Sequence, residues 1–172
     1  MSQRLSGQVR SVPVSDPLVA GCPYDYADAF AVEVAGPGPD PDPPEAWMRA
    51  GMASTPALVD WIAARLGHQD ASEPSPEAVE GFRVVQSTPE VLQLEQSMPL
   101  LDVVLIARRT GSRGRLLTSV LTYRRPVLAR VVWSVLRYGH RWAVRGLITS
   151  SSRFPATRTG ALGPEVSDRS AG

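Results

Sequence analysis

Short stretches of alternating or continuous apolar residues recur along the chain and predict β-strands. The strands are expected over residues 27–34, 81–87, 91–96, 101–107 and 115–124. Turn-forming residues separate the last four strands by only a few positions, which favours an antiparallel meander. The stretch 101–107 is apolar at nearly every position, so both of its faces are expected to be covered.

Three other stretches repeat their apolar residues with the period of an α-helix. Two short helices are predicted, one opening at Pro44–Trp47 and one running from Thr55 to Leu66. A long helix is predicted from Pro126 to about Ile148. Its expected apolar face comprises Leu128, Val131, Val132, Val135, Trp142, Ala143 and Gly146, and its expected solvated face comprises Arg130, Ser134, Arg137, Arg141 and Arg145.

This order of elements predicts a single α+β domain over residues 24–150. A strand that leads into a long amphipathic helix suggests a curved antiparallel sheet wrapped around that helix, with space for a ligand between them. A disordered arm (1–23) and a disordered tail (151–172) are expected on either side. Residues 36–44, rich in Pro and Gly, are expected to form a stiff surface connector.

Composition excludes several classes of protein without naming a reaction. The 18 basic and 17 acidic residues give a net charge of +1, which supplies no bulk field toward nucleic acid or an anionic membrane. All basic residues are Arg, as is typical of a GC-rich genome. A single cysteine, Cys22, excludes a disulfide or a thiolate metal cage within one chain. No secretory signal pattern and no membrane-spanning run occur, so a cytoplasmic location is expected.

Four short motifs follow one another in a characteristic order. They are Asp25–Phe30, Pro44–Trp47, Leu101–Asp102 and His140–Arg141. Together with the element order, they resemble the helix-grip fold of the START, plant-allergen and polyketide cyclase/dehydrase superfamily (SRPBCC). Within it, the chain is most similar to a bacterial family of unknown function, which occurs alone or fused behind short-chain-dehydrogenase-like domains. The resemblance covers about residues 24–150.

The resemblance implies an internal, mostly apolar cavity between the sheet and the long helix. It implies no particular reaction, because this superfamily includes carriers, cyclases, hydrolases and adaptors. Relatives often carry a histidine immediately before the Leu101–Asp102 pair, where this chain has Leu100. If that histidine acts chemically in relatives, this chain lacks the activity or performs it with other groups.

His140 and Asp102 are the candidate catalytic residues, if the protein is an enzyme. Imidazole titrates near neutral pH, and His140 lies at the edge of the expected apolar face, between Leu136 and Val144. Asp102 begins an apolar strand, where a carboxylate facing a cavity would have a raised pKa. The alternative for His140 is a boundary histidine bonded to a backbone carbonyl or to water. The alternative for Asp102 is a place at the strand end, either solvated or paired with an arginine such as Arg124.

Five residues are candidates for ligand binding, because pockets combine apolar walls with a few polar groups. They are Tyr26, Asp28, Tyr123, Trp133 and Trp142. The alternative for Asp28 is hydrogen bonding within a turn. The alternative for Tyr123 and the two tryptophans is packing in the core.

The sequence leaves three functions open. The first is binding of a small hydrophobic molecule, and the second is a cyclase, isomerase or lyase reaction on a polyketide- or terpenoid-like substrate. The third is a protein-interaction module for an oxidoreductase, and a homodimer is a further option. An enzyme requires two titratable groups that converge on one cavity. Because no metal-ligand spacing, phosphate-binding loop or nucleophile motif occurs, no metal or other cofactor and no nucleic-acid partner is expected.

Overall fold

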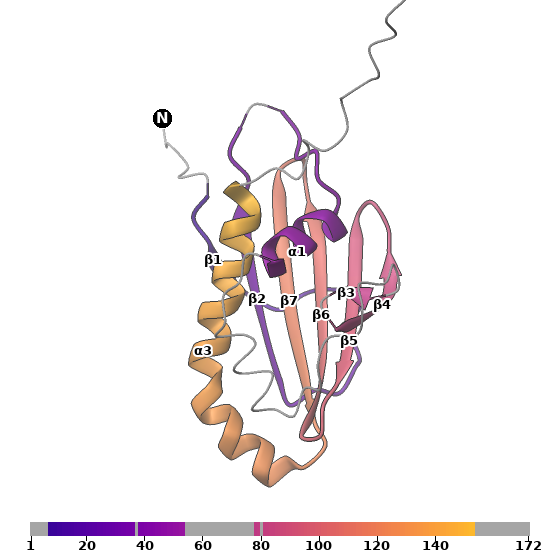
Figure 1. Ribbon diagram of the computed structural model, residues 1–172, viewed down its shortest axis with the longest axis vertical. Helices are drawn as coiled ribbons and strands as arrows, with labels where there is room; N and C mark the ends of the chain where they lie inside the picture. Colours follow the sequence, from indigo (N-terminus) through magenta and orange to yellow (C-terminus); the bar gives the residue numbers. More distant parts are fainter. Residues whose placement is uncertain (1–6, 37, 54–77, 80, 154–172) are drawn as a thin grey trace, which may run out of the picture.

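The computed structural model of the protein describes residues 7–36, 38–53, 78–79 and 81–153 (Figure 1). In these residues, seven antiparallel strands form one curved, open sheet beside a long C-terminal helix, which confirms the α+β class. The elements are β1 (Arg10–Val12), β2 (Tyr26–Glu33), α1 (Pro44–Ala53), β3 (Ala78–Val79), β4 (Phe82–Ser87), β5 (Val91–Ser97), β6 (Leu101–Thr110), β7 (Gly114–Tyr123) and α3 (Pro126–Arg153). The second short helix, predicted over 55–66, lies outside the described residues, as does the tail beyond 153.

The strands follow the order β1-β2-β7-β6-β5-β4-β3 across the sheet. β4 to β7 form the predicted antiparallel meander. β2 then pairs with β7 along its whole length, from Tyr26 opposite Leu121 to Glu33 opposite Gly114. This pairing brings the first and last strands of the predicted domain together next to α3 (Figure 1).

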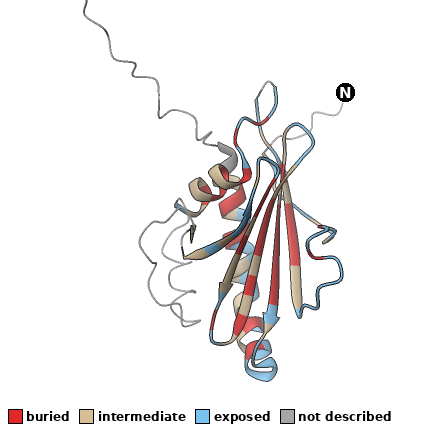
Figure 2. Cartoon of the chain, turned by 90° about the vertical axis from the view of Figure 1, so that its right-hand side faces the viewer, coloured by how far each residue is buried: buried red, intermediate tan, exposed pale blue. Residues whose placement is uncertain are grey.

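One face of the sheet packs against α3 and α1 and carries the main hydrophobic core. Buried residues run along the central strands (Figure 2). Strand alternation places the even-numbered residues of β2 and the odd-numbered residues of β6 and β7 on this face. The largest fully buried apolar side chains are Trp47, Phe30, Met48, Leu92, Leu94, Leu101, Ile106, Leu117, Leu121 and Ile148, and all except Ile106 belong to this core.

The N-terminal arm covers part of the opposite face. Val19 packs there against Ile106 and Val120, and β1 extends the sheet by pairing with β2. The described part of the predicted arm, residues 7–23, therefore lies against the sheet, because the apolar outer side of β6 needs a cover that the arm supplies. The expectation that both faces of the 101–107 strand are covered is confirmed by the same packing.

An ion pair fastens the arm to β6. The buried carboxylate of Asp16 accepts hydrogen bonds from Arg108 Nε (2.7 Å) and Nη2 (3.0 Å) and from the Leu18 N–H (3.0 Å). Burial alone would raise the pKa of Asp16, but these hydrogen bonds and the charge of Arg108 outweigh it, so the pKa lies below its ordinary value. The pair thus stabilises the folded arm as long as Asp16 is ionised.

Asp16→Asn is expected to lower the free energy of unfolding at neutral pH and to make it less dependent on pH in acid. Because the folded pKa is depressed, Asp16 contributes stability that is present above its unfolded pKa of about 4 and is lost as pH falls through the folded pKa. Urea unfolding should show a loss of about 1.5–3 kcal/mol at neutral pH and a shallower further loss in acid. Glu90→Gln, at an exposed carboxylate, is the matched control. If the free energy of unfolding of Asp16→Asn falls with decreasing pH as steeply as that of the wild type, Asp16 does not have this role.

The predicted surface connector is held against the end of the sheet by a buried ion cluster. Arg115 of β7 is 1 % exposed and donates from Nε to Asp40 Oδ2 (2.6 Å) and from Nη2 to Asp42 Oδ2 (3.1 Å). Its guanidinium lies 5.5 Å from the centre of the Trp47 ring. Burial opposes ionisation of Asp40, but Arg115 outweighs it and lowers the pKa of that carboxyl. Asp40 and Asp42 are therefore interior residues within an otherwise largely exposed segment.

The buried face of α3 overlaps only in part with the one predicted. It comprises Ala129, Trp133, Leu136, His140, Ala143, Val144, Leu147 and Ile148 in buried or half-buried positions. Much of the predicted apolar face is exposed, including Val135 at 72 % and Trp142 at 59 %. Apolar residues surround the first half of the helix, so periodicity alone does not fix its rotation, whereas packing of Trp133 and of Leu147 does. The predicted arginine face is exposed as expected.

The contact between α1 and α3 depends on Gly51. A Cβ atom there would lie 2.9 Å from both Cδ2 and the carbonyl oxygen of Leu147, so Gly51→Ala should destabilise the protein by about 1–3 kcal/mol. Gly146→Ala is the matched control, because its Cβ meets nothing within 4 Å and alanine favours a helix by about 1 kcal/mol. Urea unfolding measures the stability of both variants. Equal losses of stability at Gly51 and Gly146 would show that the close approach of α1 to α3 does not cause the effect at Gly51.

Candidate functional site

Two neighbouring rows of the sheet and the facing row of α3 each place a polar side chain among apolar ones between the sheet and the helix. These side chains are Asp28 in β2, Ser119 in β7 and His140 in α3. Asp28 and Ser119 are direct cross-strand partners, so their side chains project from the same side of the sheet. His140 approaches from the helix, with Nε2 3.6 Å from Asp28 Oδ1. The polar side chains of three elements therefore meet between the sheet and α3.

Aromatic rings surround this meeting point. The Trp133 ring centre lies 5.2 Å from that of Tyr26 and 5.0 Å from that of His140, in edge-on and tilted arrangements. The Tyr26 hydroxyl donates a 2.8 Å hydrogen bond to Asp28 Oδ2. We call these five residues, Tyr26, Asp28, Ser119, Trp133 and His140, the polar cluster.

Four atoms of the polar cluster are buried and make no hydrogen bond. They are Asp28 Oδ1, Ser119 Oγ, Trp133 Nε1 and His140 Nε2. The 3.6 Å between Asp28 and His140 is too long for a hydrogen bond. Each such atom costs about 1–3 kcal/mol when it is left without a partner, and most buried polar groups in native proteins have one. Among the described residues, only two other buried polar side-chain atoms make no hydrogen bond. They are Trp47 Nε1 and Thr118 Oγ1, and both lie outside the cluster.

The unpartnered atoms offer both donors and acceptors. Asp28 Oδ1 accepts, the Trp133 indole N–H donates, and the Ser119 hydroxyl can do either. Burial, and then the hydrogen bond to Asp28, raise the pKa of Tyr26 well above its ordinary value. The Tyr26 hydroxyl therefore stays protonated at neutral pH and holds one oxygen of Asp28, which leaves the other oxygen available to a ligand.

The structure brings together four of the residues predicted from sequence. Tyr26, Asp28, Trp133 and His140 all belong to the polar cluster. Sequence reasoning missed Ser119 as a site residue. Its signal is present in the sequence, because Ser119 is the one hydroxyl between Leu117 and Leu121 in an inward-facing row.

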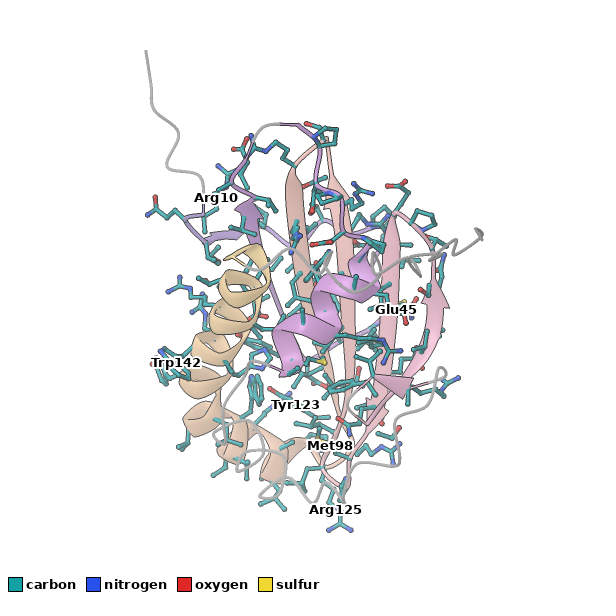
Figure 3. All side chains as sticks on the ribbon, turned by 45° about the horizontal axis from the view of Figure 1, so that its top comes forward. Arg10, Glu45, Met98, Tyr123, Arg125 and Trp142 are labelled. Atoms are coloured by element: carbon teal, nitrogen blue, oxygen red, sulfur yellow. The ribbon has the colours of Figure 1, made fainter. Side chains whose placement is uncertain are left out.

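The other three predicted residues lie elsewhere. Asp102 forms an exposed ion pair with Arg124 at 2.8 Å, and the hydrogen bond from Arg124 lowers its pKa. Asp102 is therefore paired with Arg124, as in the alternative that the sequence left open. Trp142 points away from the sheet (Figure 3). Tyr123 is half-buried beside the core, and burial and the charge of Asp25 raise its pKa.

The chain matches no protein-family model, no curated protein and no solved structure. Among the described residues, no group of three or more His, Cys, Asp or Glu side chains is placed to hold a metal ion. None of the described helices combines the length and apolarity needed to cross a membrane. The geometry of the polar cluster is therefore the basis for the functional proposal.

Proposed function

We propose that the protein is a helix-grip domain whose polar cluster binds one hydroxyl or carbonyl group of a small, mostly apolar molecule. The proposal rests on the four buried, unpartnered polar atoms of the cluster, which come from two strands and one helix. A ligand that supplied one donor and one acceptor would satisfy atoms that otherwise destabilise the fold. The apolar remainder of the ligand would contact the surrounding core side chains.

The chemistry of the cluster sets the ligand class. A hydroxyl can donate to Asp28 Oδ1 and accept from the Trp133 N–H, and a carbonyl can accept from Trp133 or Ser119. A hydrocarbon of the same shape can do neither. This site should therefore prefer a polar ligand over a hydrocarbon of the same shape, which a purely apolar cavity would not. The preference arises because a bound hydrocarbon leaves the buried polar groups of the site without hydrogen-bond partners.

Thermal unfolding of the full chain in the presence of 1-phenylethanol, acetophenone or ethylbenzene tests the proposal. A ligand of the folded state raises Tm with concentration. We expect the alcohol and the ketone to raise Tm more than ethylbenzene, and we expect Ser119→Ala/His140→Phe, which removes two of the four unpartnered atoms, to reduce that difference. Ser97→Ala, at an exposed hydroxyl, is the control. Equal effects of all three compounds on the wild type would mean that ordered water, not a ligand, satisfies the cluster.

Proton transfer on the bound molecule is a second candidate function, favoured by the approach of His140 to Asp28. A carboxylate beside an imidazole can orient it as a general acid or base, and such contacts tighten when substrate binds. Acetophenone in deuterium oxide provides the test, since His140 would remove a methyl proton next to the carbonyl and return a deuteron. Deuterium incorporation seen by NMR, and lost in His140→Phe, supports catalysis. If the wild type incorporates deuterium no faster than buffer without protein, binding alone remains as the proposed function.

A further inference from the structure

The outer side of α3 carries a continuous row of large exposed apolar side chains. They are Val127, Leu128, Val131, Val135, Tyr138 and Trp142, between 47 % and 81 % exposed, and we call them the outer ridge. The row extends over about 22 Å along the helix. Exposed apolar residues are ordinary when scattered, but a contiguous row marks a surface that binds something.

The charge along α3 has one sign. Between Pro126 and Thr149 the sequence holds four arginines and no aspartate or glutamate, although the net charge of the whole chain is only +1. These arginines are exposed beside the outer ridge: Arg130, Arg137, Arg141 and Arg145. A second copy of the same helix would therefore place arginine rows against each other. The complementary surface is anionic as well as apolar.

Two aromatic residues indicate which anionic surface fits. Tyr138 and Trp142 are 67 % and 59 % exposed, and these side chain types concentrate at the boundary between lipid headgroups and hydrocarbon. Arginine beside such residues can keep its charge at the headgroups while its apolar stem lies deeper. A bilayer offers phosphates and hydrocarbon all along a straight ridge, whereas a protein partner would need a matching acidic row.

We propose that the outer ridge of α3 docks the protein peripherally on an anionic lipid bilayer. α3 lies at the edge of the molecule, with its other side against the sheet, so the helix can lie parallel to a membrane without unfolding (Figure 1). The docking does not depend on the ligand site, because no residue of the outer ridge belongs to the polar cluster.

Co-sedimentation of the full chain with vesicles tests the proposal. One set of vesicles contains phosphatidylcholine alone, and the other an equal mixture of phosphatidylcholine and phosphatidylglycerol. We expect the partition coefficient to be at least about tenfold higher for the anionic vesicles at low salt and to fall as salt is added. On these vesicles the fluorescence of the wild type should shift to shorter wavelength, and Trp142→Phe should lose that shift.

Two pairs of variants separate the outer ridge from nonspecific adhesion. Val135→Ser/Trp142→Ser and Arg137→Gln/Arg141→Gln should each lower anionic partitioning by at least about tenfold with an unchanged circular dichroism spectrum. The matched controls, Val85→Ser and Arg83→Gln on β4, should bind as the wild type does. Absence of vesicle binding, equal binding to both vesicles, or equal losses in the controls would overturn the proposal. So would concentration-dependent dimerisation through the ridge in place of vesicle binding.

Discussion

Arg115→Leu is expected to destabilise the protein by about 3–5 kcal/mol, because it leaves the carboxylates of Asp40 and Asp42 buried without their countercharge. Both carboxylates and the guanidinium are almost completely buried, so water cannot replace the lost partner. Urea unfolding at neutral pH measures the change. A loss of this size is a large fraction of the free energy of unfolding of a typical domain, which is about 5–15 kcal/mol.

The matched control for this variant is Arg83→Leu. Arg83 also belongs to the sheet and forms an ion pair, at 2.8 Å with Glu95, but its side chain is 70 % exposed. An exposed pair contributes less than about 1 kcal/mol. The triple variant Arg115→Leu/Asp40→Asn/Asp42→Asn should recover part of the loss, since it removes the unpaired charges. Similar losses at Arg115 and Arg83 would contradict the role given to the buried cluster.

Ser119→Ala/His140→Phe is expected to leave the ligand-free protein as stable as the wild type or more stable, by up to about 1–3 kcal/mol, because it removes buried polar atoms that have no partner. The same variant should reduce the extra rise in Tm that 1-phenylethanol gives over ethylbenzene. Increased stability with loss of function is the usual signature of a site that is strained for binding. Urea unfolding and thermal unfolding with 1-phenylethanol measure the two effects.

Tyr26→Phe supplies the contrast within the same cluster. It removes a hydroxyl that does donate a hydrogen bond to Asp28, so it should destabilise the protein by about 1.5–3 kcal/mol. Opposite signs for the two variants would identify the unpartnered atoms as functional. If Ser119→Ala/His140→Phe loses as much stability as Tyr26→Phe, the cluster is a structural network and the ligand proposal fails.

The strands of the meander were predictable from sequence because each has an apolar face that packs on the core and is joined to the next by a short turn. Residues 91–96 alternate, and β5 spans Val91–Ser97, while the continuous apolar run 101–107 lies within β6. This local pattern is enough to predict the antiparallel pairing, because a shift of the strand register by one residue would turn the apolar face toward solvent. The local pattern does not predict which segment covers the outer face of the sheet. The N-terminal arm covers it through a few contacts between residues far apart in the sequence, such as Asp16 with Arg108.

The polar cluster was only partly predictable for the same reason. His140 and Trp133 share the buried face of α3, but the sequence alone favoured a face that includes Trp142, because valine and leucine surround the helix. The pairing of His140 with Asp28 rather than Asp102 depends on the return of β2 to β7, which is a long-range contact. The burial of Arg115 depends likewise on two carboxylates from a proline-rich segment.

The indole N–H resonances of the four tryptophans offer the most direct test of the ligand site. Trp→Phe variants assign each resonance in a proton–nitrogen correlation spectrum, and 1-phenylethanol is then added. We expect the Trp133 resonance to shift until the protein is saturated with ligand, since its unpartnered N–H gains an acceptor, while the Trp142 resonance does not move. A Trp133 resonance that stays fixed while another tryptophan responds would contradict this expectation.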